Sequence, residues 1–527
     1  MTDKDPCALP VGPDELARAR ETLRRYKSGK AALEERIVEE ELWWRLRHWE
    51  ASGRNRRPGA PAPSSAWLFN TILNKHADVM DNCPEPAVLP REPGDADAAK
   101  AVGAILPVVL EQCGFADTYA AQAWEKLKHG TAVYGVFWDA QKEHGLGDIE
   151  LRGLDLLNIF WEPGVTDVQA SRNLFLVDLV DTDVLEAAFP EHAGRLSDRS
   201  VELKRYYHDE QIDLTDKSVV VDWYYKRRAH GRTLLHYAKF CGDALLYASE
   251  NDPLYAERGY YDHGLYPVVF DPLFPEKGSP AGFGYIAVTK DPQEYIDRLS
   301  ANLLESALMA TKKRFFVSTS TNVNPEQFAD WDQRIVPVEG ELSAARIQEI
   351  RLDPVSGVYM DLLRQKISEM KDTAGNRDVN AGGVGGGVTA AAAIAALQEA
   401  GNKTSRDLIA ASFRAHEHLC RLCLELMRQF YDDSRAFRVT GEDGQWAFLD
   451  YGAAAGAEAV YRRPVFDLKI RARRRNPFSV AEQNERAREL FALGFFDPAK
   501  ADQAAAALEM MEFEGRDALL QKLRGRA

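Results

Sequence analysis

The pattern of hydrophobic and polar positions predicts helices toward both ends of the chain and strands in between. Apolar residues recur at helical spacing within residues 14–50, 67–82 and 97–130. Residues 131–275 instead hold short runs rich in Val, Tyr, Phe and Trp, such as TAVYGVFWD and SVVVDWYYKRR, which are typical of strands. A polar run at 51–66 predicts a loop, and AVLPREPGDADAAKAV predicts a turn. The order of these elements predicts an α+β fold.

After residue 290 the pattern returns to helix. Asp291, Pro292 and Glu294 are a helix-start signal, with a capping side chain, a proline at the first helical position and a carboxylate at the third. Asp353–Pro354 repeats the signal before a second helical stripe that ends near residue 375. Between the two helices, FFVSTS and RIVPVEG predict short strands.

A glycine-rich segment, NRDVNAGGVGGGV at 376–388, precedes a predicted helix over 389–432. That helix would be about 65 Å long at 1.5 Å per residue. Helices of this length usually belong to an assembly or a large scaffold. Strands are predicted within 433–475 and helices within 479–527.

The glycine-rich segment is a weak candidate for nucleotide binding. A Walker loop needs a Lys before its final Ser or Thr, and here Val388 and Thr389 follow the glycines. A dinucleotide loop follows a strand, whereas this loop follows a helix. The glycines are better explained by a loop whose backbone needs many positive φ angles than by nucleotide binding. With no HExxH or GxSxG pattern either, we expect no catalytic site and no cofactor.

Six cysteines are too few for a disulfide framework and fit a reducing compartment. His416, His418, Cys420 and Cys423 form the pattern H-x-H-x-C-x-x-C inside the long helix, which raises the alternative of a zinc site. Structural zinc sites usually gather two ligand pairs from separate elements, and a helical Cys is commonly a small apolar filler. We therefore expect no metal, and metal analysis of the purified protein would decide between the two.

The run Arg471–Arg475 (RARRR) has two readings, contact with nucleic acid or a solvated strand edge guarded by charge, and the second is favoured. Trp43, Trp44 and Trp49 are expected to serve packing or subunit contact rather than base stacking.

Composition narrows the class of protein further. The 527 residues suggest three or four structural units, and the 45% hydrophobic and 28% charged residues are ordinary for a folded chain. The net charge of −15 argues against tight binding to nucleic acid, which requires basic neutralisation of phosphates. No apolar run reaches 18 residues, and MTDKDPCALP lacks a signal-peptide pattern, so we expect no membrane contact and no export.

The order of helix, small β insert, helix, glycine-rich loop and very long helix resembles the portal proteins of tailed bacteriophages and their prophages. Several stretches look like portals from prophages of Firmicutes, and the similarity covers about residues 60–500. The stretches are WLFNTILNKHADVMDN, KHGTAVYGVFWD, DLLNIFWEPGVTD, RNLFLVDLVDTD, GVTAAAAIAALQEAG, SRDLIAASFRA and NPFSVAEQNERARELFALGFFDP.

The resemblance implies a portal architecture for the chain. Its parts would be an N-terminal helical segment at 1–60, an α+β wing at 61–289, stem helices at 290–312 and 354–375, a clip at 313–353, a tunnel loop at 376–388, the long helix at 389–432, a further β part of the wing at 433–475 and a crown at 476–527.

Site residues follow from the same resemblance. The tunnel loop would face a DNA channel through Asn376, Arg377, Asp378, Val379, Asn380, Gly382, Gly383, Val384, Gly385, Gly386, Gly387 and Val388. Lys312, Lys313 and Arg314, at the junction of stem and clip, would either ring the channel exit or simply cap the helix.

The implied function is structural. About twelve copies would form a ring at one vertex of the virion capsid, a dodecamer and head–tail connector through which double-stranded DNA is packaged, retained and ejected. Partners would be the large terminase, then the head–tail adaptor, with major capsid or scaffold protein around the ring, and assembly would occur in the host bacterial cytoplasm. The alternatives are a nucleotide-driven translocase and a non-viral helical scaffold protein.

The acidic balance fits a conduit. Residues 290–375 hold 11 Lys or Arg and 14 Asp or Glu, so the proposed channel segment is slightly acidic. A channel must let DNA slide, and counterion-release binding at many phosphates would hold the duplex in place.

Overall fold

The computed structural model is an α+β fold, which confirms the predicted fold class. Its described residues are 11–53, 60–198, 201–206, 214–229, 231–311, 314–317, 326, 347–350, 357–375, 403–431, 435–440, 446–451, 465–474, 488–494 and 501–509. The chain divides into two compact units, each described by itself. We call them the body unit (Met1–Glu39, Ile72–Tyr285 and Ala391–Ala527) and the helical unit (Glu40–Thr71 and Ile286–Ala390).

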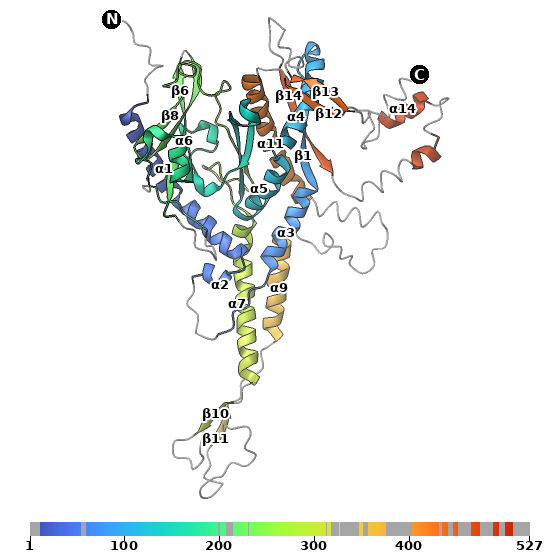
Figure 1. The fold of residues 1–527 in the computed structure, drawn as a ribbon. Helices are drawn as coiled ribbons and strands as arrows, with labels where there is room; N and C mark the ends of the chain where they lie inside the picture. Colours follow the sequence, from blue (N-terminus) through green and yellow to red (C-terminus); the bar gives the residue numbers. More distant parts are fainter. Residues whose placement is uncertain are drawn as a thin grey trace, which may run out of the picture. The chain divides into compact units, whose positions relative to one another are not determined.

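A five-stranded antiparallel sheet forms one layer of the body unit (Figure 1). Its strands, in spatial order, are β4 (Ile159–Trp161), β5 (Asn173–Asp181), β6 (Lys217–Ala229), β7 (Arg232–Cys241) and β8 (Ala244–Ala248). Leu16 and Leu23 of α1 (Pro13–Trp44) join Phe175 and Trp223 of the sheet in one buried cluster. The apolar stripe of α1 therefore covers one face of this sheet.

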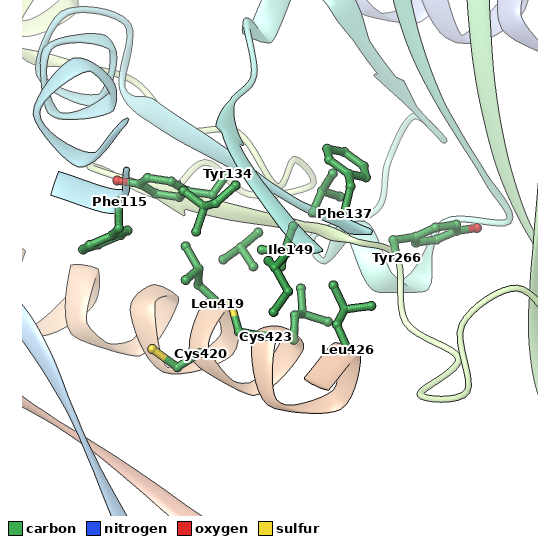
Figure 2. Packing of buried hydrophobic residues seen from close by; sticks show 14 of the residues in the cluster. Phe115, Tyr134, Phe137, Ile149, Tyr266, Leu419, Cys420, Cys423 and Leu426 are labelled. Carbon is green, nitrogen blue, oxygen red and sulfur yellow. The ribbon is translucent and has the colours of Figure 1, made fainter. Parts of the chain in front are cut away.

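A three-stranded sheet lies in the largest core cluster, in the order β3 (Asp148–Gly153), β2 (Thr131–Asp139) and β9 (Val268–Pro272). Helix α11 (Lys403–Phe430) packs on it, and Figure 2 shows Leu419, Cys423 and Leu426 pointing toward Tyr134 and Ile149. Helices α4 (Ala96–Gln112) and α5 (Phe115–His129) add to the same core. Helix α11 is thus the central support of the body unit. It is the described part of the helix predicted over 389–432, of which residues 389–402 lie outside the described residues.

A buried ion pair ties three of these elements together. The Lys126 ammonium of α5 donates to Asp271 Oδ1 of β9 at 2.7 Å and to the hydroxyl of Ser412 on α11. Both charged side chains are nearly inaccessible to solvent. Each charge is therefore compensated inside the core, as burial of an ion requires.

Two small sheets complete the described body unit, β1 (Asn82–Pro90) with β14 (Phe466–Arg474) and β12 (Ala436–Thr440) with β13 (Trp446–Asp450). The Arg91 amide donates to the Val465 carbonyl, which fixes the phase of the β1–β14 ladder. Pro84, Pro86 and Pro90 therefore occupy positions whose N–H would point away from β14. A proline is tolerated there because it has no N–H to lose from the ladder.

The helical unit contains α7 (Tyr285–Thr311) from Ile286 onward, α9 (Gly357–Ala374), α2 (His48–Ala51) and the start of α3 (Trp67–Met80). It also contains the two-stranded pair β10 (Arg314–Val317) and β11 (Ile347–Ile350). The remaining short elements of the described chain are α6 (Thr182–Ala188), α14 (Ala501–Glu509), η1 (Pro93–Asp95), η2 (Glu143–Gly145), η3 (Leu156–Asn158), η4 (Val168–Ala170) and η5 (Pro190–His192).

Among the described helices, none is by itself long and apolar enough to cross a membrane, although one bent pair, Pro93–Gln112 with Phe115–His129, passes by length and composition.

Two predicted helices are interrupted. The helix predicted over 14–50 ends at Trp44, and Leu46 takes a positive φ of 59° before α2 begins at His48. The helix predicted over 97–130 breaks at Gly114, which adopts a left-handed conformation between α4 and α5. Helical periodicity alone does not reveal such single-residue breaks.

The predicted helix start at Asp291 is wrong. Helix α7 begins at Tyr285, and Pro292 lies inside it. Pro292 has no N–H for the Val288 carbonyl, a loss that the helix interior normally avoids. Ile286 and Thr289, which precede the proline, are fully buried, so packing of the first two turns extends the helix past a start signal.

The strand predictions for 131–275 are confirmed, but other strands were missed. The turn predicted at AVLPREPGDADAAKAV is partly wrong because Ala87–Pro90 belong to β1, whose prolines made it look like a turn. Strand β8 was also missed. FFVSTS overlaps β10, but its partner is β11, whereas RIVPVEG lies outside the described residues.

Candidate functional site

Most of the predicted site residues lie outside the described part of the chain. The glycine-rich segment from Asn376 to Val388 lies outside the described residues, as do Lys312 and Lys313. Arg314 begins β10, where its backbone pairs with Ile350. What the structure describes is the pair of helices that border these segments, α7 before Lys312 and α9 before Asn376.

Helix α9 ends in a defined way before the glycine-rich segment. Its last residue is Ala374, and Gly375 follows with a φ of +68°. The Gly375 amide donates to the Asp372 carbonyl at 3.1 Å. A glycine in the left-handed conformation is a common helix C-terminus because it has no Cβ to clash.

Helices α7 and α9 lie side by side within the helical unit (Figure 1), and Tyr295 marks their contact. The Lys366 ammonium of α9 lies 5.7 Å from the centre of the Tyr295 ring, and the Arg298 guanidinium lies 5.8 Å from it. Lys366 also pairs with Glu369 at 2.7 Å. These contacts are half exposed, so each contributes only modestly to stability.

The same two helices expose many apolar side chains. Val358 is 70% exposed, Tyr359 52% and Leu304 44%. Other exposed apolar residues on α7 and α9 are Tyr295, Leu308, Met360 and Leu362. A concentration of apolar residues on two neighbouring surface helices marks an interaction site more often than single exposed residues do.

A buried histidine–aspartate contact joins α7 to α2. His48 Nδ1 lies 2.5 Å from Asp297 Oδ2, and His48 Nε2 lies 3.1 Å from the Trp43 carbonyl oxygen. The side chains of His48 and Asp297 are 2% and 3% exposed. Both ring nitrogens thus have an oxygen partner, one on a side chain of α7 and one on the backbone at the end of α1.

Gln293, one turn before Asp297, extends this network. Its Nε2 donates to the Ser65 carbonyl at 2.8 Å and to Asp297 Oδ1 at 3.0 Å, while its Oε1 accepts from the Leu68 amide at 3.0 Å. The Ser65 amide and hydroxyl both donate to Asp297 Oδ1 at 2.8 Å. Two adjacent polar residues on α7 therefore hold the chain that leads into α3.

The sequence reasoning missed this network. Asp297 and Gln293 are four residues apart on the face of α7 that also carries the buried Ile296. A carboxylate and an amide on an otherwise apolar helical face were the available signal, but their partners at 43–68 are more than 220 residues away. Local periodicity carries no information on such contacts.

The three tryptophans of this region make contacts within the described chain, in agreement with the packing part of the prediction of packing or subunit contact. Trp43 is buried, with its ring 4.8 Å from that of His48, and Trp44 stacks on Phe69 at 4.6 Å. Trp49 Nε1 donates to the Pro63 carbonyl at 3.1 Å.

The histidine and cysteine pattern of α11 points into the core. Cys420 and Cys423 are fully buried, and His416 packs against Phe115 with ring centres 4.7 Å apart. Burial lowers the pKa of His416 to about 3 and raises the pKa of the Cys420 thiol, so both are neutral near pH 7. His418 is exposed. Among the described residues, no group of three or more His, Cys, Asp or Glu side chains could hold a metal ion.

The basic run at 471–475 overlaps the end of β14. Arg471 is exposed and lies opposite Glu85 of β1, and Lys469, two residues earlier, is also exposed. In the described sheet β14 has one partner strand, so the position at a sheet edge that the sequence predicted is confirmed for Arg471.

Comparison with known families identifies the chain. Residues 76–527 match the family of phage P22-like portal proteins, and no curated protein matches the chain. The match covers most of the chain and confirms the resemblance to tailed-phage portals, while the narrower likeness to Firmicutes prophages stays a prediction. The chain belongs to the phage P22-like portal proteins, a family of structural capsid proteins used in DNA packaging.

Proposed function

We propose that the chain forms a closed ring of about twelve copies at one capsid vertex and that double-stranded DNA passes through its centre. Packaging, retention and ejection of the genome would share this channel. A ring requires heterologous contacts, in which one surface of each subunit meets a different surface of the next and the rotation closes.

The observation that carries this proposal is the exposed apolar surface of α7 and α9. Tyr359 and Leu304 lie on helices of 18 and 27 residues, which are about 27 and 40 Å long at 1.5 Å per residue. Rigid helices with apolar flanks suit the wall of a channel, because neighbouring copies can bury those flanks against each other.

The parts of the chain take the following roles in this proposal. The wing is 61–289 with 433–475, after an N-terminal helical segment at 1–60. The stem helices are 290–312 and 354–375, the clip is 313–353, the tunnel loop is 376–388, the long helix is 389–432 and the crown is 476–527. The β10–β11 pair is too small to be stable alone, which favours completion of the clip sheet by neighbouring subunits.

The tunnel loop would contact DNA transiently. Its glycines give the backbone freedom, Asn376, Arg377, Asp378 and Asn380 supply polar groups, and Val384 and Val388 supply apolar contacts. Deletion of residues 381–387 should impair packaging or retention of DNA while the ring still forms. Normal packaging by that deletion would contradict the role of the loop.

Lys312, Lys313 and Arg314 would place positive charge at the junction of stem and clip. Substitution of all three by Gln should reduce retention of packaged DNA and leave the melting temperature unchanged. A lower melting temperature with normal retention would instead indicate that they only cap the helix.

The partners would bind in sequence. The large terminase would dock on the clip during packaging, the head–tail adaptor would replace it, and major capsid or scaffold protein would surround the ring. The protein would be assembled in the host bacterial cytoplasm and kept in the virion.

Negative-stain microscopy with mass photometry tests the central proposal. Purified chain should form rings with a central hole whose mass is a multiple of 59.0 kDa close to twelve. A monodisperse monomer at micromolar concentration would overturn it.

A further inference from the structure

A groove of about 460 Å³ runs along the outer side of β9 in the body unit. Its floor includes Val268 and Phe270 of β9, one wall is η4 with the residues before it, and the other wall carries His418, Arg421 and Leu422 of α11. The volume is within the range of sites that hold small ligands or a few residues of peptide.

Strand β9 is an edge of its sheet among the described strands, since it pairs only with β2. The Leu273 amide donates to the Gly130 carbonyl at 2.8 Å, and the Val136 amide donates to the Pro267 carbonyl at 2.9 Å. These two bonds set the phase of the antiparallel ladder. The N–H and C=O groups of Val268 and Phe270 therefore point away from β2, toward the groove.

The outward backbone groups of Val268 and Phe270 have no hydrogen-bond partner in the described part of the chain. Val268 is nevertheless only 1% exposed. Buried backbone N–H and C=O groups are nearly always paired, because an unpaired group loses its hydration without compensation. The floor of the groove thus lacks a strand-like partner.

Two residues before Val268, at Tyr266, a side chain of the protein already takes the place of such a partner. Gln169 of η4 donates from Nε2 to the Tyr266 carbonyl at 3.0 Å and accepts from the Tyr266 amide at 2.9 Å. Lys226 Nζ holds Gln169 in place by donating to its Oε1 at 3.2 Å and to its carbonyl at 2.5 Å. The side-chain amide of Gln169 therefore pairs with the backbone of Tyr266 as an antiparallel strand would. The next outward-facing residues along this edge are Val268 and Phe270.

Charge distinguishes the two walls. Arg421 on α11 is 52% exposed, and among described residues its ion pair is with Glu417, one turn away on the same helix. His418 next to it is exposed. The opposite wall carries Asp167, whose Oδ1 accepts from the backbone amide of Gln169. An occupant that extends along β9 would meet a basic wall on the side of α11.

We propose that this groove binds an extended peptide segment of another protein, which adds as a fourth strand beside β9 and turns an acidic side chain toward Arg421. Backbone hydrogen bonds to Val268 and Phe270 would supply affinity, and alternate side chains would supply specificity. The inference goes beyond the portal ring and does not depend on it, because every residue involved lies in the body unit.

The first test is fluorescence anisotropy with the labelled peptide Ac-Thr-Val-Glu-Val-Thr-NH2. We expect it to bind the full chain, and to bind Arg421→Glu about tenfold more weakly, as loss of a charge-assisted contact would give. Arg414→Glu, an exposed arginine on the same helix, is the matched control and should bind normally. Equal binding by both variants, or no binding by the wild-type chain at millimolar peptide, would overturn the proposal.

N-methylation of the peptide distinguishes strand addition from general adhesion. Methylation of one alternate set of amides should abolish binding, whereas methylation of the other set should leave it within about threefold. Val268→Pro should weaken binding as well, because it removes an outward N–H and no ladder bond to β2. Equal effects of the two methylation patterns would contradict pairing with β9.

Amide exchange then identifies the source of the occupant. The Val268 and Phe270 amides should exchange more slowly when the peptide is added than in the isolated chain. Self-association of the chain should leave their exchange unchanged. Protection by self-association alone would mean that a second copy fills the groove, and it would overturn the assignment to another protein.

Discussion

The body unit and the helical unit bury their side chains in different ways. The body unit closes its sheets around α11 and compensates its charges internally, as Lys126 and Asp271 show. Among its described residues, the helical unit buries a polar network at His48 and Asp297 and leaves apolar residues such as Tyr359 on its surface. The body unit thus has its own core, whereas the helical unit has surfaces that suit contact with further copies.

The largest effect on stability should come from the buried ion pair of the body unit. Asp271→Ala leaves the Lys126 ammonium buried without its counter-ion and should lower the free energy of unfolding by about 3–5 kcal/mol. Glu369→Ala removes the exposed partner of Lys366 in the helical unit and should cost less than about 0.5 kcal/mol. Urea unfolding followed by tryptophan fluorescence measures both. Similar losses would contradict the contrast between the units.

Substitutions in the polar network of the helical unit should have the second-largest effect on stability. Asp297→Ala removes the partner of His48 Nδ1 and the acceptor of the Ser65 amide and hydroxyl, all buried or half-buried, which should cost about 3 kcal/mol. Asp297→Asn should cost clearly less, because its side-chain oxygen still accepts from Ser65 while His48 keeps its contact with the Trp43 carbonyl. The readouts are urea unfolding and proteolysis near residues 52–66. Equal destabilisation by both variants would argue against the role of these hydrogen bonds.

The buried His416 of α11 should make the body unit sensitive to acid. Burial lowers the pKa of His416 from 6.5 to about 3, so between these values the unfolded chain binds a proton that the folded chain does not. Stability should therefore fall as pH drops below 6.5, by at most about 1.4 kcal/mol per unit from this residue. His416→Gln should flatten that part of the profile, measured by urea unfolding from pH 7 to 4.5. An unchanged slope would contradict a neutral buried imidazole.

The smallest effect on stability should come from the exposed apolar surface. Leu304→Ser and Tyr359→Ser should each change the free energy of unfolding by less than about 0.5 kcal/mol. The same variants should reduce the fraction of rings in mass photometry, because they remove apolar area from the proposed subunit contact. Ring formation at the wild-type level by the double variant would place that contact elsewhere.

Much of the body unit could be predicted from the sequence because its signals are local. Runs such as TAVYGVFWD and SVVVDWYYKRR alternate or concentrate β-branched and aromatic residues, and they became β2 and β6. The apolar stripe of α11 was equally clear in the sequence, since residues such as Leu419 and Leu426 recur at helical spacing. Both are buried in the structure. Cys420 and Cys423 were placed in the core by the same periodicity.

What could not be predicted depends on contacts between distant segments. Strand β1 looked like a turn because its prolines are unfavourable except at an edge, and the edge exists only once β14 pairs with it. The start of α7 was displaced because burial of Ile286 outweighs a capping signal at Asp291. The pairing of His48 with Asp297 joins residues 249 apart in sequence, and no local pattern encodes it.

The prolines of β1 have a consequence for production of the protein in many copies. Pro84, Pro86 and Pro90 remove the N–H donor at three of the outward positions of that strand, so its outer margin is a poor template for a strand from a neighbouring molecule. Crowded, newly made chains are thereby protected at this margin from fibrillar aggregation. The prolines that made β1 look like a turn in the sequence thus also favour solubility of the chain before assembly.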